Sequence, residues 1–174
     1  RVIELLAGKM DELTLGDPGL LSTDIGPVID EDAKAGLQAH IERMKTEATL
    51  IKAVALNADC EHGSFVAPHA FELQSLAQLQ REVFGPVLHV IRYDADKLDD
   101  ILAQINATGY GLTLGIHSRI DETVSKIARS VHVGNCYVNR NQIGAVVGVQ
   151  PFGGEGLSGT GPKAGGPHYL LKFA

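Results

Sequence analysis

The residues of this sequence that could do chemistry are concentrated between Gly144 and Pro167, in the stretch GAVVGVQPFGGEGLSGTGPKAGGP. Nine of the chain's 20 glycines fall in these 24 positions, a density that disfavours a helix or an ordinary strand because glycine loses the most backbone freedom on folding. Successive backbone N–H groups in a glycine-rich loop can form a concave site that holds an anion. The stretch therefore predicts a loop that contacts a ligand, with a purely structural turn region as the alternative.

Two phosphate-binding motifs are excluded from this stretch. Gly154, Gly156 and Gly159 satisfy the pattern G-x-G-x-x-G, but a dinucleotide fingerprint needs a helix directly after it and an acid about 20 residues further on. Only 15 residues follow Gly159. A P-loop is excluded because no Gly-Lys-Ser or Gly-Lys-Thr follows the glycines.

The two cysteines lack the surroundings that activate a thiol, which are a base, a cation or a helix N-terminus. Cys60 lies between two acids, Asp59 and Glu61, with no neighbouring cation in the sequence. Cys60 and His62 are spaced like part of a metal site, but no second ligand pair follows, so a surface loop is the interpretation. Cys136 is predicted to be a small packed residue within a strand. We therefore predict no catalytic residue and no metal site in this chain.

Glu82 is the acid whose position best suits a binding site. It precedes a Phe-Gly-Pro turn at which a strand begins, so we expect it at a strand edge near a turn. An ordinary surface carboxylate is the alternative. His89, His117 and His132 lie in or near predicted sheet elements, which favours structural roles for them.

The hydrophobic periodicity indicates which elements position these residues. A helix is predicted after the N-cap Asp30, with a buried stripe at Ala33, Leu37, Ile41 and Met44. Further helices are predicted over 2–13, 97–106 and 121–131, strands over 49–56, 87–93 (buried), 112–117 and 135–139, and an extended segment interrupted by proline over 65–73.

The alternation of strand and helix from 87 to 139 is typical of βαβ units with a parallel sheet. In such sheets ligands lie beyond the carboxyl ends of the strands, and the glycine-rich stretch follows the last predicted strand. Topology and composition thus predict a site in the same place.

The composition favours a globular domain and argues against a nucleic-acid-binding or membrane-spanning protein. The 174 residues are 44% hydrophobic, which is enough for one domain with a sizeable core. A net charge of −6 argues against a nucleic-acid partner, and no apolar run reaches the roughly 18 residues of a membrane span. Only two cysteines, far apart in the sequence, favour a reducing cytoplasmic location.

Several segments together resemble the aldehyde dehydrogenase superfamily. They are REVFGPVLHVIRY (81–93), YGLTLGIHSRI (110–120), VGNCYVNRN (133–141) and QPFGGEGLSGTG (150–161), with TDIGPVI (23–29) and GSFVAP (63–68) in matching order. The segment from 139 to 173 further resembles Δ1-pyrroline-5-carboxylate dehydrogenases, above all the module found in bacterial bifunctional proline-utilisation flavoenzymes.

This resemblance implies a three-layer αβα catalytic domain with a mostly parallel sheet, of which residues 1–174 are an incomplete part. The implied reaction is the oxidation of L-glutamate γ-semialdehyde to L-glutamate in proline catabolism, with NAD as hydride acceptor. The implied cofactor contacts are Glu82, on the nicotinamide ribose hydroxyls, and Phe84, near the same ring. For the substrate, the implied contacts are the backbone N–H groups of Gly144 and Ala145, on its carboxylate, and Phe152, on its aliphatic part.

The sequence departs from the family pattern at the catalytic residues. Neither cysteine has the family's GQ-x-C context, and the general-base glutamate, the oxyanion asparagine and the Rossmann half are also missing. We expect the rest of the parent polypeptide to supply them, this chain alone to be inactive, and the parent to be a homo-oligomer. FAD is expected only if a proline dehydrogenase domain precedes this part. An aldehyde dehydrogenase of other specificity, or a non-catalytic α/β module that binds an anion or a partner, remain alternatives.

Overall fold

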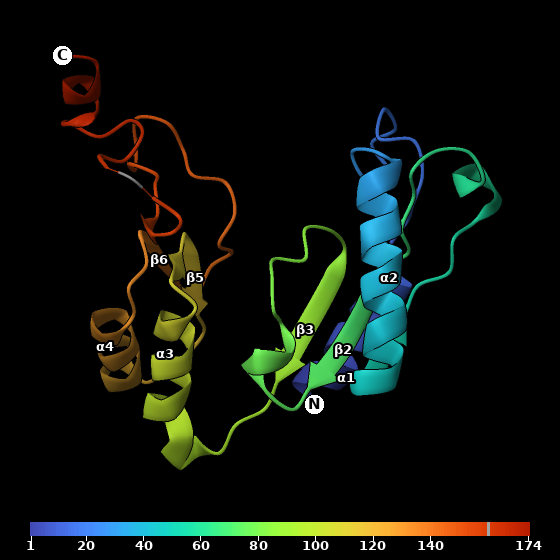
Figure 1. The fold of residues 1–174 in the computed structure, drawn as a ribbon, viewed down its shortest axis with the longest axis horizontal. Helices are drawn as coiled ribbons and strands as arrows, with labels where there is room; N and C mark the ends of the chain where they lie inside the picture. The colour runs from blue at the N-terminus through green and yellow to red at the C-terminus, as the bar shows by residue number, and fades with distance from the viewer. Residues whose placement is uncertain (160) are drawn as a thin grey trace. The chain divides into compact units, whose positions relative to one another are not determined.

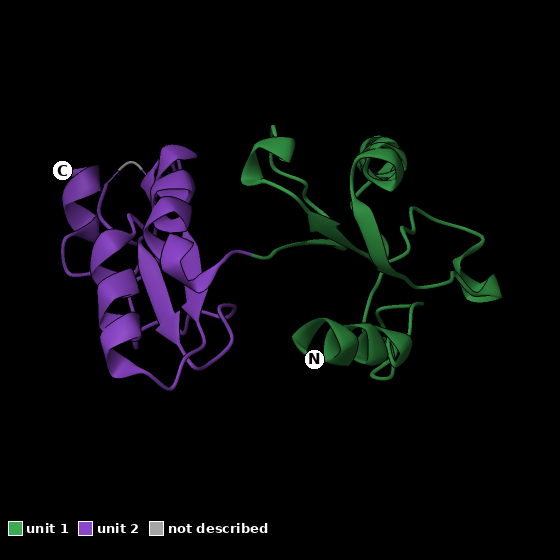
Figure 2. Ribbon diagram, turned by 90° about the horizontal axis from the view of Figure 1, so that it is seen from below, with its two compact units in different colours: residues 1–92 green, residues 93–174 purple. Residues whose placement is uncertain are grey.

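The computed structural model describes residues 1–159 and 161–174, and the chain divides after Arg92 into two units (Figure 2). Unit 1 contains a three-stranded sheet in the order β1-β2-β3, with β1 antiparallel and β3 parallel to β2. Helices α1 and α2 lie on opposite sides of this sheet (Figures 1 and 2). The elements are α1 (Val2–Asp11), α2 (Glu31–Glu47), β1 (Thr49–Ala53), η1 (Ala58–Cys60), β2 (His69–Leu73), η2 (Leu76–Gln78) and β3 (Val87–Ile91).

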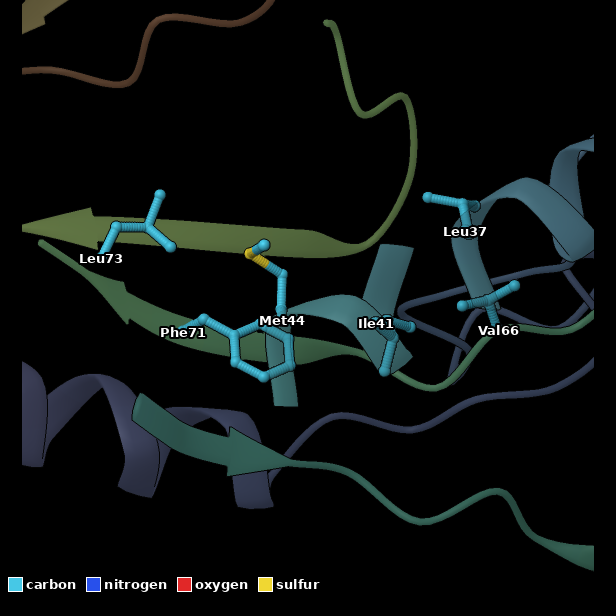
Figure 3. Packing of buried hydrophobic residues seen from close by; sticks show 6 residues of the cluster. All are labelled: Leu37, Ile41, Met44, Val66, Phe71 and Leu73. Carbon is cyan, nitrogen blue, oxygen red and sulfur yellow. The ribbon is translucent and has the colours of Figure 1, made fainter. Parts of the chain in front are cut away.

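Helix α2 begins and packs as its sequence predicts. The side chain of Asp30 accepts a hydrogen bond of 2.7 Å from the Ala33 amide, which confirms the N-cap. The apolar stripe of the helix meets β2 in the main core cluster, where Phe71 and Met44 are fully buried (Figure 3). Burying each such side chain contributes about 1.5–3 kcal/mol. The cluster is completed by Leu37, Ile41, Val66 and Leu73.

Strand β3 is less buried than the sequence indicates. It is the edge strand of its sheet, and its alternate residues Val87 and Ile91 pack against the core cluster. Leu88 points the other way and is 46% exposed in this chain. The prediction of a fully buried strand is therefore wrong, because only one face of β3 is covered.

Unit 2 contains a parallel pair and a short antiparallel pair. Strands β5 and β6 are parallel, Thr113 faces Asn135 in the register, and α4 connects the two strands. Strand β7 lies within the glycine-rich stretch and pairs with β4. The elements are η3 (Ala95–Lys97), α3 (Leu98–Ala107), β4 (Tyr110–Gly111), β5 (Thr113–Ile116), α4 (Asp121–Ser130), β6 (Asn135–Val138), β7 (Glu155–Gly156) and η4 (Tyr169–Phe173).

The α/β class is confirmed by these elements. The connection β5-α4-β6 is one of the βαβ units that the alternating pattern predicts, and β2 and β3 form a second parallel pair. The other predicted unit, from β3 through α3 to β5, is not formed in the described residues, because β3 and β5 belong to different sheets. The long segment that follows β6 begins at the carboxyl end of a parallel strand, as predicted.

Candidate functional site

Glu82 and Phe84 lie on the loop that leads into β3, and both side chains are exposed. The loop runs so close to α2 that a Cβ atom on Gly85 would lie 2.4 Å from Cδ1 of the buried Leu37. A groove of about 810 Å³ lies between this loop and the first half of α2, and we call it the α2 groove. Its polar lining comes from Asp32, His40, Arg81 and Glu82.

The carboxylate of Glu82 is available to a ligand. Among the residues that the structure describes, it takes part in no ion pair. The ring of Phe84 is 85% exposed, although it borders the groove. A carboxylate that can accept two hydrogen bonds and an uncovered aromatic ring thus lie two residues apart.

His40 connects the α2 groove to the sheet. Its Nε2 atom lies 2.9 Å from Nε2 of His89 on β3, and the two rings meet edge to face at 83°. Burial lowers the pKa of His89 to about 4, and the nearby His40 and Arg43 add to this effect. Burial also lowers the pKa of His40, followed by the charges of Arg43 and Arg81. One neutral ring therefore donates to the other at neutral pH.

The loop between β6 and Phe152, residues 139–151, contains Gly144 and Ala145, the predicted contacts to the substrate carboxylate, and we call it the β6 loop. Gly144 has φ +74°, a left-handed conformation that favours glycine, and Ala145 is half-buried. Among the described residues, neither amide donates a hydrogen bond to another backbone group. Gln150 fastens the end of the loop by donating 2.8 Å to the hydroxyl of the buried Tyr137. The β6 loop thus presents two unpaired N–H groups, and its end is anchored to Tyr137.

Phe152 is half-buried and is held by its backbone. Its N–H donates 3.0 Å to the carbonyl of Ala164, and the N–H of Ala164 donates 2.8 Å in return. Asn135, at the start of β6, binds the flanking residues: its amide donates 3.1 Å to the Pro151 carbonyl, and its oxygen accepts 3.3 Å from the Gly153 N–H.

The glycines from 153 to 159 make close backbone contacts that exclude side chains. A Cβ on Gly159 would lie 1.9 Å from the carbonyl oxygen of Gly154, and one on Gly134 would lie 1.7 Å from that of Gly153. Gly156 takes φ +59° inside β7. The glycines of the G-x-G-x-x-G pattern therefore shape a turn, and no α-helix follows them in the described residues. Thr160 lies outside the described residues.

The two cysteine side chains differ in burial from what their predicted settings suggest. Asp59, Glu61 and His62 are exposed, in agreement with the predicted surface loop, but Cys60 itself is buried because the 3₁₀ turn η1 directs it against Leu15 and Phe65. Cys136 lies in β6 as predicted, but its side chain is exposed, because Tyr137 takes the packed face of the strand. Partial desolvation raises the pKa of the Cys136 thiol, which opposes thiolate formation.

Metal ligands and membrane segments are not found in the described part of the chain. No three His, Cys, Asp or Glu side chains gather there as a metal ion would require. None of its helices combines the length and the apolar character of a membrane span.

A comparison with protein families decides the identity of the fold. The model of the aldehyde dehydrogenase family matches residues 1–174. The chain belongs to the aldehyde dehydrogenase family.

Several proteins of this family are similar in sequence. The bifunctional protein PutA of Escherichia coli is 57% identical over 98% of this chain, which corresponds to 13% of PutA. A 1-pyrroline-5-carboxylate dehydrogenase of Geobacillus is 41% identical over 98% of this chain and 32% of that protein. The chain therefore spans between an eighth and a third of the length of these relatives.

Solved structures agree with these relatives. Proline utilization A of Bradyrhizobium japonicum superposes with a TM-score of 0.94 at 61% identity, covering 99% of this chain and 17% of that one. A 1-pyrroline-5-carboxylate dehydrogenase from Thermus, solved with bound NAD, gives a TM-score of 0.87 at 39% identity, covering 99% and 33%. The resemblance to this family is thus confirmed in sequence and in fold.

The predicted site residues fall into two groups within the aldehyde dehydrogenase fold. Glu82 and Phe84 border the α2 groove of unit 1, whereas Gly144, Ala145 and Phe152 lie on the glycine-rich segment of unit 2. The sequence reasoning missed His40, although it lies at helical spacing from the buried Leu37 and Met44. A histidine on the buried stripe of a helix is the signal that could have identified it.

Proposed function

We propose that this chain forms part of the catalytic domain of an NAD-dependent dehydrogenase that oxidises L-glutamate γ-semialdehyde to L-glutamate in proline catabolism. The observation that carries the proposal is the pair of unpaired amides at Gly144 and Ala145, beyond the carboxyl end of β6. The sequence identity to 1-pyrroline-5-carboxylate dehydrogenases supports it. The low cysteine content supports a cytoplasmic location, and the parent protein is proposed to be a homo-oligomer.

The β6 loop accounts for the choice of substrate. Two adjacent backbone N–H groups can donate to the two oxygens of a carboxylate without any charged side chain. Phe152 would cover the aliphatic carbons between that carboxylate and the aldehyde. A simple aliphatic aldehyde lacks the carboxylate, so it would gain less binding energy from this loop.

The α2 groove fits the ribose and nicotinamide of NAD. The fit rests on the uncompensated Glu82 carboxylate, which can accept hydrogen bonds from two ribose hydroxyls, and on the exposed Phe84 ring beside it. NAD would supply the acceptor for the hydride that leaves the substrate. FAD would belong to another part of a bifunctional parent protein.

The nucleophile would come from elsewhere in the polypeptide. Cys60 is enclosed by apolar side chains, and partial desolvation raises the pKa of the Cys136 thiol. Burial keeps the Cys60 thiol away from an aldehyde, and the raised pKa of Cys136 disfavours the thiolate that would attack one. We therefore propose that the 174 residues alone do not catalyse the oxidation.

Measuring NADH formation by the full-length polypeptide that contains this sequence tests the proposal. Turnover of L-glutamate γ-semialdehyde with a kcat/KM at least about tenfold above that for propanal is expected from loss of the carboxylate contacts. Equal kcat/KM values would point to an aldehyde dehydrogenase of other specificity. No turnover of any aldehyde, with tight binding of glutamate, would point to a non-catalytic anion-binding module.

A further inference from the structure

Lys163 occupies an unusual place for a lysine. It is half-buried in the glycine-rich segment, and its ammonium group donates to the backbone carbonyl of Gly134 just before β6. It takes part in none of the ion pairs found among the described residues. The polar contact of Lys163 is therefore made to the backbone and not to a charged side chain.

The contact joins two backbone segments that enclose Phe152. On one side, Ala164 follows Lys163 directly and forms the reciprocal backbone bridge with Phe152. The stem of Lys163 also lies against Gly153, where an added Cβ would be 3.2 Å from the lysine Cα and Cγ atoms. Lys163 and Ala164 therefore pack against Phe152 and its neighbour Gly153.

The other side is provided by the start of β6. Gly134, which accepts from Lys163, leaves no room for a side chain between itself and the Gly153 carbonyl. Asn135 binds the Pro151 carbonyl and the Gly153 N–H, one residue before and one residue after Phe152. Phe152 is thus held at both neighbours by β6 and at its own backbone by the segment that Lys163 fastens.

We propose that Lys163 and Asn135 are positioning residues, which form a two-sided clamp that sets the orientation of Phe152 for the substrate. The proposal rests on the function proposed above, because it assigns Phe152 to the aliphatic part of the substrate. Neither clamp residue touches the substrate. Loss of the clamp weakens substrate binding through Phe152 and leaves the chemical step intact.

Kinetics of the full-length enzyme test the role in binding. Lys163→Met keeps the stem and removes the ammonium group, and it should raise the KM for the semialdehyde about tenfold while kcat changes less than about twofold. Lys163→Arg can still donate to the Gly134 carbonyl and should restore a near-normal KM. Lys172→Met, at an exposed lysine in the nearby turn η4, is the matched control and should leave the KM unchanged. A normal KM in Lys163→Met would overturn the proposal, even with a lowered Tm.

Hydrogen exchange tests the clamp independently of the reaction. In Lys163→Met, the amides of Phe152 and Ala164 should exchange at least about tenfold faster, while those of the β5–β6 pair keep their rates. Unchanged exchange at Phe152 and Ala164 would refute the clamp. If Lys163→Met does not fold, the KM for the semialdehyde and the exchange rates of the Phe152 and Ala164 amides are measured in Asn135→Ser, and the same changes are expected. If the wild-type enzyme does not oxidise the semialdehyde, the proposed function fails, while exchange still decides whether the clamp exists.

Discussion

The Nε2 atom of His40 lies 2.9 Å from the Nε2 atom of His89, so a single hydrogen bond between two imidazoles joins helix α2 to strand β3. Each ring has only one donor when neutral, and the bond needs one donor and one acceptor. The charged groups around the pair are Arg43 and Glu47 on α2 and Arg81 on the loop before β3. Two of these three are cationic, which disfavours protonation of either ring.

This pair predicts a loss of stability in mild acid. The pKa of His89 in the folded protein is about 4, below the ordinary histidine value of 6.5, so protons bind the unfolded chain more readily. The stabilisation is therefore complete above about pH 6.5 and is lost as the pH falls toward about 4. In a fully buried site, a pKa shift of this size would change the unfolding free energy by about 3 kcal/mol. Because the histidine pair is about half exposed, solvent screening reduces the expected change to about 1–2 kcal/mol.

Urea unfolding at a series of pH values measures this contribution. His89→Gln should remove about 1–2 kcal/mol of the decline in unfolding free energy between about pH 6.5 and 4. His62→Gln, at an exposed histidine of the same unit, should keep the wild-type decline. Identical pH profiles for His89→Gln and the wild-type protein would show that the histidine pair contributes no such stability.

Adding a single methyl group at Gly134 should have a large steric cost. Gly134→Ala would place Cβ 1.7 Å from the Gly153 carbonyl oxygen and 2.8 Å from the Gly154 Cα, both backbone atoms that must move. We expect a loss of about 3 kcal/mol in unfolding free energy, measured by denaturant titration.

The matched substitution is Gly8→Ala in helix α1. Nothing lies within 4 Å of the added methyl group there, and alanine favours the helix by about 0.5–1 kcal/mol. The two substitutions should therefore have opposite signs. A Gly134→Ala protein as stable as the wild type would mean that the backbone of Gly153 and Gly154 does not pack against Gly134.

Much of the fold could be predicted from the sequence because its signals are local. The N-cap Asp30, the stripe of α2 and the β5-α4-β6 unit all follow from periodicity and capping within short windows. The burial of Cys60 does not, because it depends on Leu15 and Phe65 being brought together by the turn η1. Neighbours that are distant in sequence leave no local pattern.

The candidate site was predictable only in part for the same reason. The glycine density identified the loop, and the left-handed Gly144 agrees with that prediction. The residues that hold the loop are ordinary in the sequence, and nothing local to Asn135 or Lys163 shows that both bind the backbone around Phe152. The edge position of β3, which exposes Leu88, is likewise a property of the sheet order.

Substitution of Glu82 should weaken the binding of NAD without weakening the binding of the substrate. Glu82→Gln in the full-length enzyme keeps one acceptor oxygen but removes the charge, which contributes about 1.5–3 kcal/mol to such hydrogen bonds. The KM for NAD should rise at least about tenfold, and the KM for the semialdehyde should change little. Glu61→Gln, at another exposed acid of unit 1, is the control. An unchanged KM for NAD would mean that Glu82 is an ordinary surface carboxylate.

The most direct test of the account is the KM of the Ala145→Asp variant of the full-length enzyme, measured in parallel with L-glutamate γ-semialdehyde and with propanal. The new carboxylate would lie beside the amides of Gly144 and Ala145 and repel the carboxylate of the substrate. The KM for the semialdehyde should rise by more than about tenfold, while the KM for propanal, which has no carboxylate, should stay within about twofold of the wild-type value. A semialdehyde KM equal to that of the wild-type enzyme would contradict the role proposed for these two amides.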